Sequence, residues 1–284
     1  MIERLSRLLG TEVRTLTRMA SSGYTVAYHA IAELADGRTA FVKAATEPVT
    51  AGFIRDEQRV LGALEGLFLP AVLALDDEDP PLIVLEDLRS AHWPPPWDDS
   101  MIAAVGETLA AVAATNPPDV VPPIGVHHDR LVTGWAEIEA DPVPFLSLGL
   151  CSGEWLAGAL PTLREASETA PIDGDALLHL DVRSDNLCIA ERGAVLVDWN
   201  HACVGNADLD VAAWLPSLRL EGGPEPEEIL PRAPGFAALL AGFFGSRAGL
   251  PAPPTAPHVR SFQLAQLRVA LPWATRQLDL RPPG

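Results

Sequence analysis

The feature that most constrains the fold of this chain is a short β-like insert in a half that otherwise reads as helical. Residues 177–200 read LLHLDVRSDNLCIAERGAVLVDWN. Two apolar runs, LCIA and AVLV, flank an Arg-Gly turn, a pattern typical of two short strands. Because these runs should bury their strands, the polar residues beside them are expected to form a site. A solvated polar loop is the alternative.

Three side chains of this insert carry oxygen atoms suited to metal and phosphate chemistry. Asp181 and Asn186 lie five residues apart on the predicted loop, and Asp198 ends the next strand but one. Two carboxylates and an amide oxygen are hard ligands, and such ligands suit Mg²⁺ with bound phosphates.

The first ninety residues predict an antiparallel sheet with one inserted helix. The predicted strands are 11–19, 24–34, 38–45, 69–77 and 81–88, and the predicted helix is 53–67. Asp36-Gly37 indicates a two-residue hairpin turn, because glycine supplies φ > 0. Lys43 then falls on the third strand and Glu57 in the helix. The segment MIERLSRLLG predicts a short amphipathic helix and lacks the apolar core of a signal peptide.

Helices are expected beyond a proline-rich connector at 89–99. The candidate helices span residues 98–115, 152–168, 235–247 and 256–277. The predicted fold class is α+β, with a small antiparallel β-rich N-lobe containing one helix at 1–88 and a larger, mostly helical C-lobe at 89–284.

Charge and cysteine content narrow the partners. The net charge is −18, so nucleic acid and anionic membranes are poor partners, since they bind clustered Lys and Arg. A cationic ligand would be attracted. No apolar stretch approaches the ~18 residues of a membrane span. The three cysteines are scattered, without a CxxC pair, which predicts a reducing cytoplasm.

Lys43 is the only lysine of the chain, and the other nineteen basic side chains are arginine. Lysine is a compact point charge, whereas arginine is a planar fork of donors. A site that holds one small cation between two oxyanions would reject the larger head. Chance survival of a surface lysine explains this single residue equally well.

Taken together, these motifs resemble the protein-kinase-like fold, and most of all the aminoglycoside phosphotransferase family. HLDVRSDN resembles the catalytic loop H-x-D-x-x-x-x-N, and VDW resembles the metal-binding aspartate segment. Lys43 on the third strand, Glu57 in the helix and LEDL at the lobe junction follow in the family's order. Gly205 and Asp210 match a glycine and an aspartate after the metal segment. The resemblance runs over most of the chain.

The resemblance implies a kinase that uses ATP and Mg²⁺ to phosphorylate a hydroxyl of a small molecule. Lys43, paired with Glu57, would contact the α- and β-phosphates, which accounts for a lysine at this position. Asn186 and Asp198 would hold Mg²⁺. Asp181 would accept or orient the proton of the substrate hydroxyl.

The same resemblance implies further contacts to the nucleotide and within the loop. The carbonyl of Glu86 and the amide of Leu88 would face the adenine. The turn ASSGY departs from the resemblance because it lacks the G-x-G-x-x-G pattern; Ser21 and Ser22, or backbone amides, would donate to the phosphates instead. Arg183 would contact the γ-phosphate, or would instead form a loop salt bridge with Asp185. Asp210 is expected to brace the catalytic loop.

Two departures and two alternatives bear on the function. Leu180 stands where the family often has glycine. No activation segment of protein-kinase length follows Asp198, and this absence argues against a peptide substrate.

A catalytically impaired nucleotide-binding protein is one alternative, and an unrelated Mg²⁺ hydrolase using Asp181 and Asp198 is another. Family members act on aminoglycosides, macrolides, choline or homoserine, and the acidic composition favours a polycationic aminoglycoside. The oligomeric state is not predicted.

Overall fold

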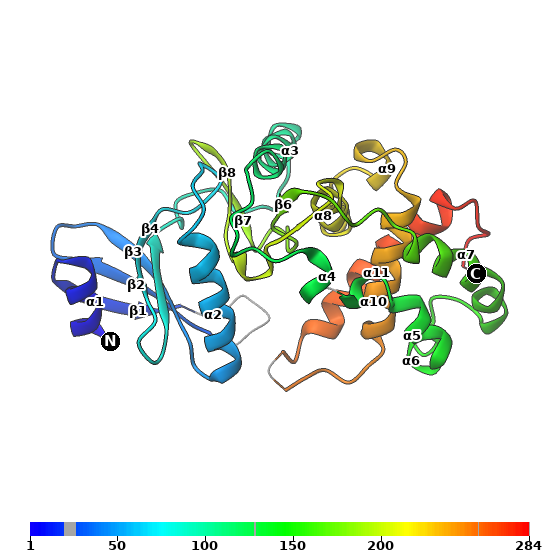
Figure 1. The fold of residues 1–284 in the computed structure, drawn as a ribbon, viewed down its shortest axis with the longest axis horizontal. Helices are drawn as coiled ribbons and strands as arrows, with labels where there is room; N and C mark the ends of the chain where they lie inside the picture. The colour runs from blue at the N-terminus through cyan, green and yellow to red at the C-terminus, as the bar shows by residue number, and fades with distance from the viewer. Residues whose placement is uncertain (20–26, 128, 255, 284) are drawn as a thin grey trace.

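The chain folds into two lobes, a β-rich one and a larger helical one, which lie side by side in Figure 1. The computed structural model describes residues 1–19, 27–127, 129–254 and 256–283. The two termini lie at opposite ends of the long axis. The predicted α+β two-lobe fold is confirmed, while the lobe boundary after residue 88 stays a prediction.

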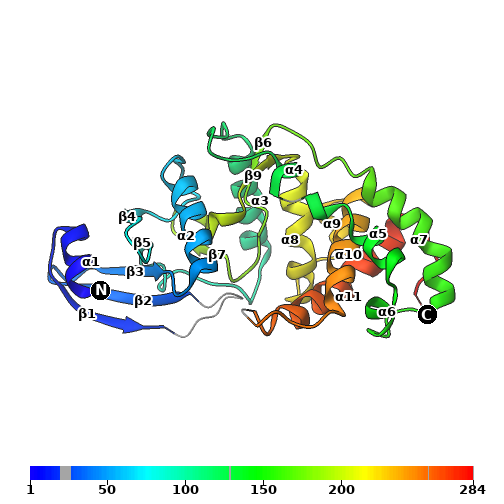
Figure 2. The same cartoon turned by 60° about the horizontal axis from the view of Figure 1, so that its bottom comes forward.

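The β-rich lobe is built on one antiparallel sheet whose strands follow the order β1-β2-β3-β5-β4. Its elements are α1 (Ile2–Leu9), β1 (Val13–Arg18), β2 (Tyr28–Leu34), β3 (Thr39–Ala44), α2 (Pro48–Leu61), β4 (Val72–Asp76) and β5 (Leu82–Glu86). A small core that includes Leu5 of α1 and Val42 of β3 holds α1 on the sheet. Helix α2 lies on the side that faces the helical lobe (Figures 1 and 2).

The hairpin between β2 and β3 is present, but its loop is one residue longer than predicted. Glu33 pairs with Thr39, and the amide of Leu34 donates to the carbonyl of Arg38 at 2.9 Å. Residues 35–37 therefore form a three-residue loop. Gly37 takes φ 86°, which suits the left-handed position of such a loop. The extra residue shifts the strand pairing by one position.

Helix α2 also differs from its prediction. It begins at Pro48, because proline suits the first turn and Glu47 and Thr50 form a reciprocal capping box. It ends at Leu61, so Leu64 and Leu67 lie beyond it. Leu67 is 71% exposed. The apolar spacing that suggested residues 53–67 continued past Gly62, where the helix is capped.

The helical lobe contains the four predicted helices, with ends within about three residues of those expected, and several shorter elements. Its helices are α3 (Asp99–Ala113), α4 (Ile124–His127), η1 (Asp129–Leu131), α5 (Gly134–Ala140), α6 (Val143–Leu146), α7 (Gly153–Glu168), η2 (Trp199–His201), α8 (Asp208–Leu220), α9 (Pro226–Ile229), α10 (Pro234–Ala248) and α11 (Val259–Gln277). Its strands are β6 (Ala176–Leu178), β7 (Leu187–Ala190), β8 (Gly193–Leu196) and β9 (Cys203–Gly205). The predicted β-like insert is the β7–β8 hairpin, with β6 paired to β9.

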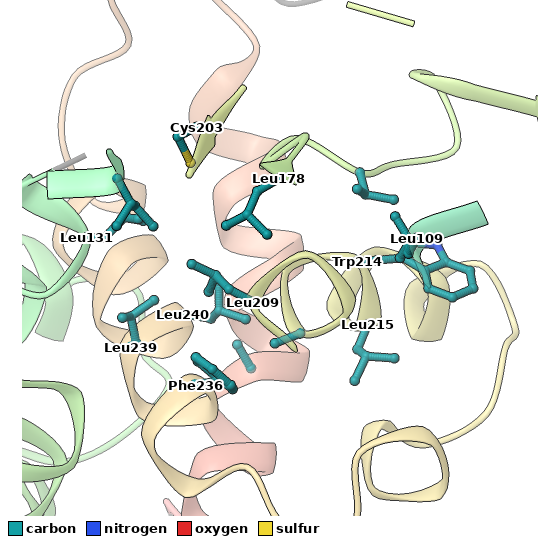
Figure 3. Packing of buried hydrophobic residues seen from close by; sticks show 14 of the residues in the cluster. Leu109, Leu131, Leu178, Cys203, Leu209, Trp214, Leu215, Phe236, Leu239 and Leu240 are labelled. Atoms are coloured by element: carbon teal, nitrogen blue, oxygen red, sulfur yellow. The ribbon is translucent and has the colours of Figure 1, made fainter. Parts of the chain in front are cut away.

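The main hydrophobic core holds the segment that carries the polar loop. Leu178, the last residue of β6, packs with Leu209 of α8 and Leu240 of α10, as Figure 3 shows. All three side chains are at most 4% exposed. The loop that starts at His179 therefore leaves a rigid base. In the part of the chain that the structure describes, no helix is both long enough and apolar enough to cross a membrane.

Candidate active site

The loop at 179–186 is tied to α8 by a buried carboxylate. The backbone amides of His179 and Leu180 donate to the two oxygens of Asp210, each at 2.7 Å. Burial raises the pKa of Asp210 to about 6, although the two amide hydrogen bonds act in the opposite direction. Leu180 takes φ 61°, in the left-handed region. Asp210 thus braces the loop, as predicted.

His179 is a structural member of the loop. Its Nδ1 accepts from the backbone amide of Asp181 at 3.3 Å, and its Nε2 donates to the carbonyl of Val197 at 2.9 Å. The ring packs edge-on against Trp199, with centroids 4.7 Å apart. Burial lowers the pKa of His179 to about 4. The imidazole is therefore neutral and links the loop to the end of β8.

Asp181 and Asn186 lie together at the centre of the loop. The side-chain amide of Asn186 donates to Asp181 Oδ2 at 2.8 Å and to the Asp181 carbonyl at 2.9 Å. Arg183 forms an ion pair with the other oxygen of Asp181. It also donates to Asp185 at 2.9 and 3.1 Å, so the loop salt bridge that was one reading of Arg183 is formed.

Across from the loop, Lys43 bridges two carboxylates from different lobes. Its Nζ lies 2.7 Å from Glu57 Oε2 in α2 and 2.5 Å from Asp198 Oδ1 at the end of β8. Glu57 is buried, with 1% of its side chain exposed, whereas 38% of the Asp198 side chain is exposed.

The charges of this trio depend on one another. Burial alone would lower the pKa of Lys43, but Asp198 and Glu57 raise it above its ordinary value. Burial raises the pKa of Glu57. Burial also acts to raise the pKa of Asp198, but the charge and hydrogen bond of Lys43 lower it. Lys43 is thus a permanent cation beside Asp198 at neutral pH.

The donor set at Asn186 and Asp198 fits Mg²⁺. The Asn186 nitrogen is directed to Asp181, which leaves its amide oxygen for a cation, and Asp198 contacts Lys43 through Oδ1. Among the described residues, no group of three or more His, Cys, Asp and Glu side chains is arranged to hold a metal. Mg²⁺ does not need such a group, because it usually keeps phosphate and water ligands beside one or two carboxylates.

Two cavities meet at these residues. One, of about 500 Å³, lies between the lobes, and its walls include Leu85, Glu86 and Leu88. The other, of about 410 Å³, opens toward the helical lobe and includes Asp181 and Arg183. The residues common to both walls are His29, Lys43, Asn186 and Asp198. Such volumes suit small molecules.

The structure places the predicted nucleotide contacts in the cavity between the lobes. Glu86 and Leu88 line it, and the Leu88 carbonyl accepts from the indole of Trp93 at 2.9 Å. The Glu86 side chain accepts from the backbone amide of Ala71 at 2.7 Å. Ser22 lies outside the described residues.

Two residues at or near the candidate site were not predicted. His29 lies opposite Lys43 in the strand pairing and lines both cavities. Arg192, in the turn of the β7–β8 hairpin, forms an ion pair with Glu86 and donates to the carbonyls of Leu67 and Leu69 at 3.1 and 3.2 Å. It thereby connects the hairpin to the β-rich lobe. A prediction with the correct hairpin register would have placed His29 opposite Lys43.

Comparison with known proteins gives one family and many structures. Residues 21–244 match the family described as "Phosphotransferase enzyme family". A search of the curated proteins finds no match. The similar solved structures include a protein assigned as a fructosamine-3-kinase from Thermobifida fusca YX-ER1, with 21% identity, 96% of this chain and 98% of that chain covered, and a TM-score of 0.56.

Two other solved structures share the architecture at lower identity. A macrolide 2'-phosphotransferase type I has 18% identity, covers 97% of this chain and 96% of its own, and gives a TM-score of 0.52. An aminoglycoside phosphotransferase from Alicyclobacillus acidocaldarius subsp. acidocaldarius has 14% identity, 94% and 91% coverage, and a TM-score of 0.56. At these identities the likeness shows the protein-kinase-like fold.

Proposed function

The chain belongs to the phosphotransferase enzyme family, and we therefore propose that it transfers the terminal phosphate of ATP to a hydroxyl of a small molecule with the help of Mg²⁺. One observation carries the proposal. The ion pairs of Lys43 with Glu57 and Asp198 lie where the two cavities meet, and Asp181 lines the cavity on the side of the helical lobe. One cavity can hold the nucleotide and the other the acceptor.

The nucleotide would bind between the lobes, against the sheet. Adenine would meet the backbone of Glu86 and Leu88, and Ser22 would add a donor to the phosphates. Lys43 would hold the α- and β-phosphates while Glu57 keeps its ammonium group in place. Asn186 and Asp198 would hold Mg²⁺, which when bound neutralises phosphate charge. Residues 1–88 would thus supply most nucleotide contacts, and residues 89–284 the acceptor site.

Phosphoryl transfer would take place beside Asp181. The acceptor hydroxyl oxygen forms a bond to the γ-phosphorus, and the bond from that phosphorus to the β-phosphate oxygen breaks, releasing ADP. The hydroxyl proton passes to Asp181. Asn186 fixes one carboxylate oxygen of Asp181, and Arg183 pairs with the other. Arg183 is close enough to the base to meet the transferring phosphate.

An ADP-release assay with Asp181→Asn tests this function. Wild type should release ADP only with ATP, Mg²⁺ and a suitable acceptor. Asp181→Asn should reduce kcat by about 10²–10⁴-fold while the affinity for ATP is largely kept, because Asp181 faces the acceptor. The matched control is Asp208→Asn, an exposed carboxylate at the start of α8, which should behave as wild type.

The assay also separates the alternatives. Nucleotide binding without ADP release across gentamicin, erythromycin, choline and homoserine would favour a catalytically impaired nucleotide-binding protein. An equal loss of ATP affinity in Asp181→Asn would assign this residue to the metal or to the structure. We infer a cytoplasmic reaction, since Cys151, Cys188 and Cys203 are free thiols. The acidic composition favoured an aminoglycoside acceptor. The residues that line the cavity on the acceptor side can be compared with this candidate.

A further inference from the structure

The cavity on the acceptor side has mostly apolar walls. Phe53 comes from α2, Phe243 and Phe244 from α10, and Phe262 from α11. The other apolar residues of the wall are Ala27, Ile54, Leu131, Leu180, Val182, Leu209, Ala213, Leu240, Ala256 and Val259. A molecule that fills this space exchanges water for aliphatic and aromatic surface, which favours an apolar body.

The two carboxylates in the walls of this cavity are already paired with basic side chains. The acidic residues among its described walls are Asp181 and Asp198, and each already pairs with a cation, Arg183 or Lys43. A polycation would therefore find no carboxylate on these walls that lacks a basic partner. An amine that enters this space would be desolvated against mostly apolar walls.

Further positive charge lies behind the aromatic wall. The guanidinium carbon of Arg247 lies 4.2 Å from the centre of the Phe243 ring. Burial lowers the pKa of Arg247, and the nearby Arg130 and Arg260 lower it further, while Glu137 acts to raise it. Arg247 therefore packs against the Phe243 ring and interacts electrostatically with Arg130, Arg260 and Glu137.

Two buried side-chain atoms of the wall, His29 Nε2 and Gln266 Oε1, have no hydrogen-bond partner among the described residues. Gln266 of α11 is 6% exposed, and its Oε1 accepts no hydrogen bond from any residue that the structure describes. A buried amide oxygen without a donor costs stability. Rotation of the terminal amide exchanges its oxygen and nitrogen, so either atom can turn toward the cavity. A donor on a bound molecule would satisfy this group.

We propose that the acceptor is an uncharged hydroxyl compound with an aromatic or aliphatic body, which lies against Phe243, Phe244 and Phe262 and donates a hydrogen bond to Gln266. The inference rests on the proposed function, since it specifies the acceptor of that reaction. It differs from the aminoglycoside expectation, because a polycation would be desolvated against the mostly apolar walls.

A matched pair of ligands tests the charge preference by binding alone. Phenylserinol carries an ammonium group at neutral pH, and N-acetylphenylserinol has the same diol and ring with a neutral amide. Calorimetry on the wild-type protein with ADP and Mg²⁺ measures affinity without turnover, because ADP has no γ-phosphate to transfer, so failure of the phosphotransfer proposal does not affect the comparison. The neutral compound should bind at least about tenfold more tightly. Equal or tighter binding of phenylserinol or gentamicin, or no binding of the neutral compound, would overturn the inference.

Gln266→Leu tests the hydrogen bond. Leucine has a similar size and needs no partner, so the Tm should stay equal or rise by a few degrees, while the Kd for N-acetylphenylserinol should rise about tenfold. Gln277→Leu is the control in the same helix. Gln277 accepts from the amide of Ala233 at 2.8 Å and donates to the carbonyl of Pro231 at 3.2 Å. This variant should lower the Tm and leave the Kd unchanged.

The two readouts together separate recognition from structure. If Gln266→Leu lowers the Tm as much as Gln277→Leu does, the amide is structural and the proposal is wrong. An unchanged Kd in Gln266→Leu would also contradict it.

Discussion

Removing the charge of Lys43 should destabilise the protein mainly through Glu57. In Lys43→Met, the Glu57 carboxylate keeps a hydrogen bond from the backbone of Trp199 but loses its cation, and its side chain is 1% exposed. Removing one partner of a buried ion pair costs about 3–5 kcal/mol. The other partner, Asp198, is 38% exposed, so water compensates for most of its loss.

The magnitude converts to a measurable shift in Tm. At about 2.1 cal/mol/K of unfolding entropy per residue, a chain of 284 residues loses about 1 °C for every ~0.6 kcal/mol. We therefore expect Lys43→Met to melt about 5–8 °C below wild type at pH 8. Adding Glu57→Gln removes the unpaired charge and should restore most of the Tm. Neither variant should have kinase activity.

The pH dependence gives the sign of the effect. An acid whose pKa is higher in the folded than in the unfolded chain binds its proton more tightly when folded. Burial raises the pKa of Glu57 above its ordinary 4.5, and the loss of Lys43 raises it further. The contribution of Glu57 to the stability of Lys43→Met should therefore be most favourable below about pH 4.5 and be lost as the pH rises through the raised pKa. The difference from wild type should shrink on acidification.

Differential scanning calorimetry of wild type, the single variant and the double variant checks this reasoning. A double variant as unstable as Lys43→Met at pH 8 would refute it, because the cost could not then reside in the Glu57 charge. Lys43→Arg is the charge-preserving control. It should keep more of the Tm, but its larger head cannot occupy the space 2.7 Å from Glu57 and 2.5 Å from Asp198. Its kcat/KM should still fall severely.

Two further predictions concern the metal and the connection between lobes. In Asp198→Ala, ATP should raise the Tm equally with Mg²⁺ and with a chelator, whereas the Tm of wild type should rise more with Mg²⁺. If Mg²⁺ adds as much to the Tm of the variant as to that of wild type, the metal is held elsewhere. Arg192→Met removes the contacts with Glu86 and the carbonyls of Leu67 and Leu69. Steady-state kinetics should then show a KM for ATP raised about 3–10-fold, which corresponds to a loss of about 1 kcal/mol. The kcat should stay within about twofold of wild type. Arg38→Met, which removes an exposed pair with Asp36, is its control, and an equal KM change in both variants would refute the role of Arg192.

Local signals were sufficient for most of the β-rich lobe and for the residues that meet at the candidate active site. The Asp36-Gly37 turn and the apolar strands predicted the sheet, and the spacing of Asp181 and Asn186 matched a loop that does bring them together. The error lay in the length of the turn. A two-residue loop would place Ala30 opposite Lys43, whereas the observed loop places His29 there. One residue of register decided which side chain reaches both cavities.

The acceptor cavity was beyond prediction because its walls come from distant segments. Phe53 is in α2, Phe243 in α10 and Gln266 in α11, and only tertiary packing brings them together. Net charge cannot specify the acceptor for the same reason. It sums surface carboxylates over the whole chain and says nothing about which charges line one cavity.

The loop at 179–186 shows why supporting residues are hard to recognise from sequence. Leu180 takes φ 61° and Asp198 takes φ 70°, conformations that cost a non-glycine residue about 1–2 kcal/mol. At Leu180 the cost is offset by Asp210, thirty residues later, which accepts from the amides of His179 and Leu180. A glycine there would adopt this shape without help, but leucine adds apolar surface to the acceptor cavity. The hydrogen bonds from Asp210 allow a bulky residue at position 180. Leucine in place of the family's glycine can therefore shape the acceptor site while the loop at 179–186 keeps its geometry.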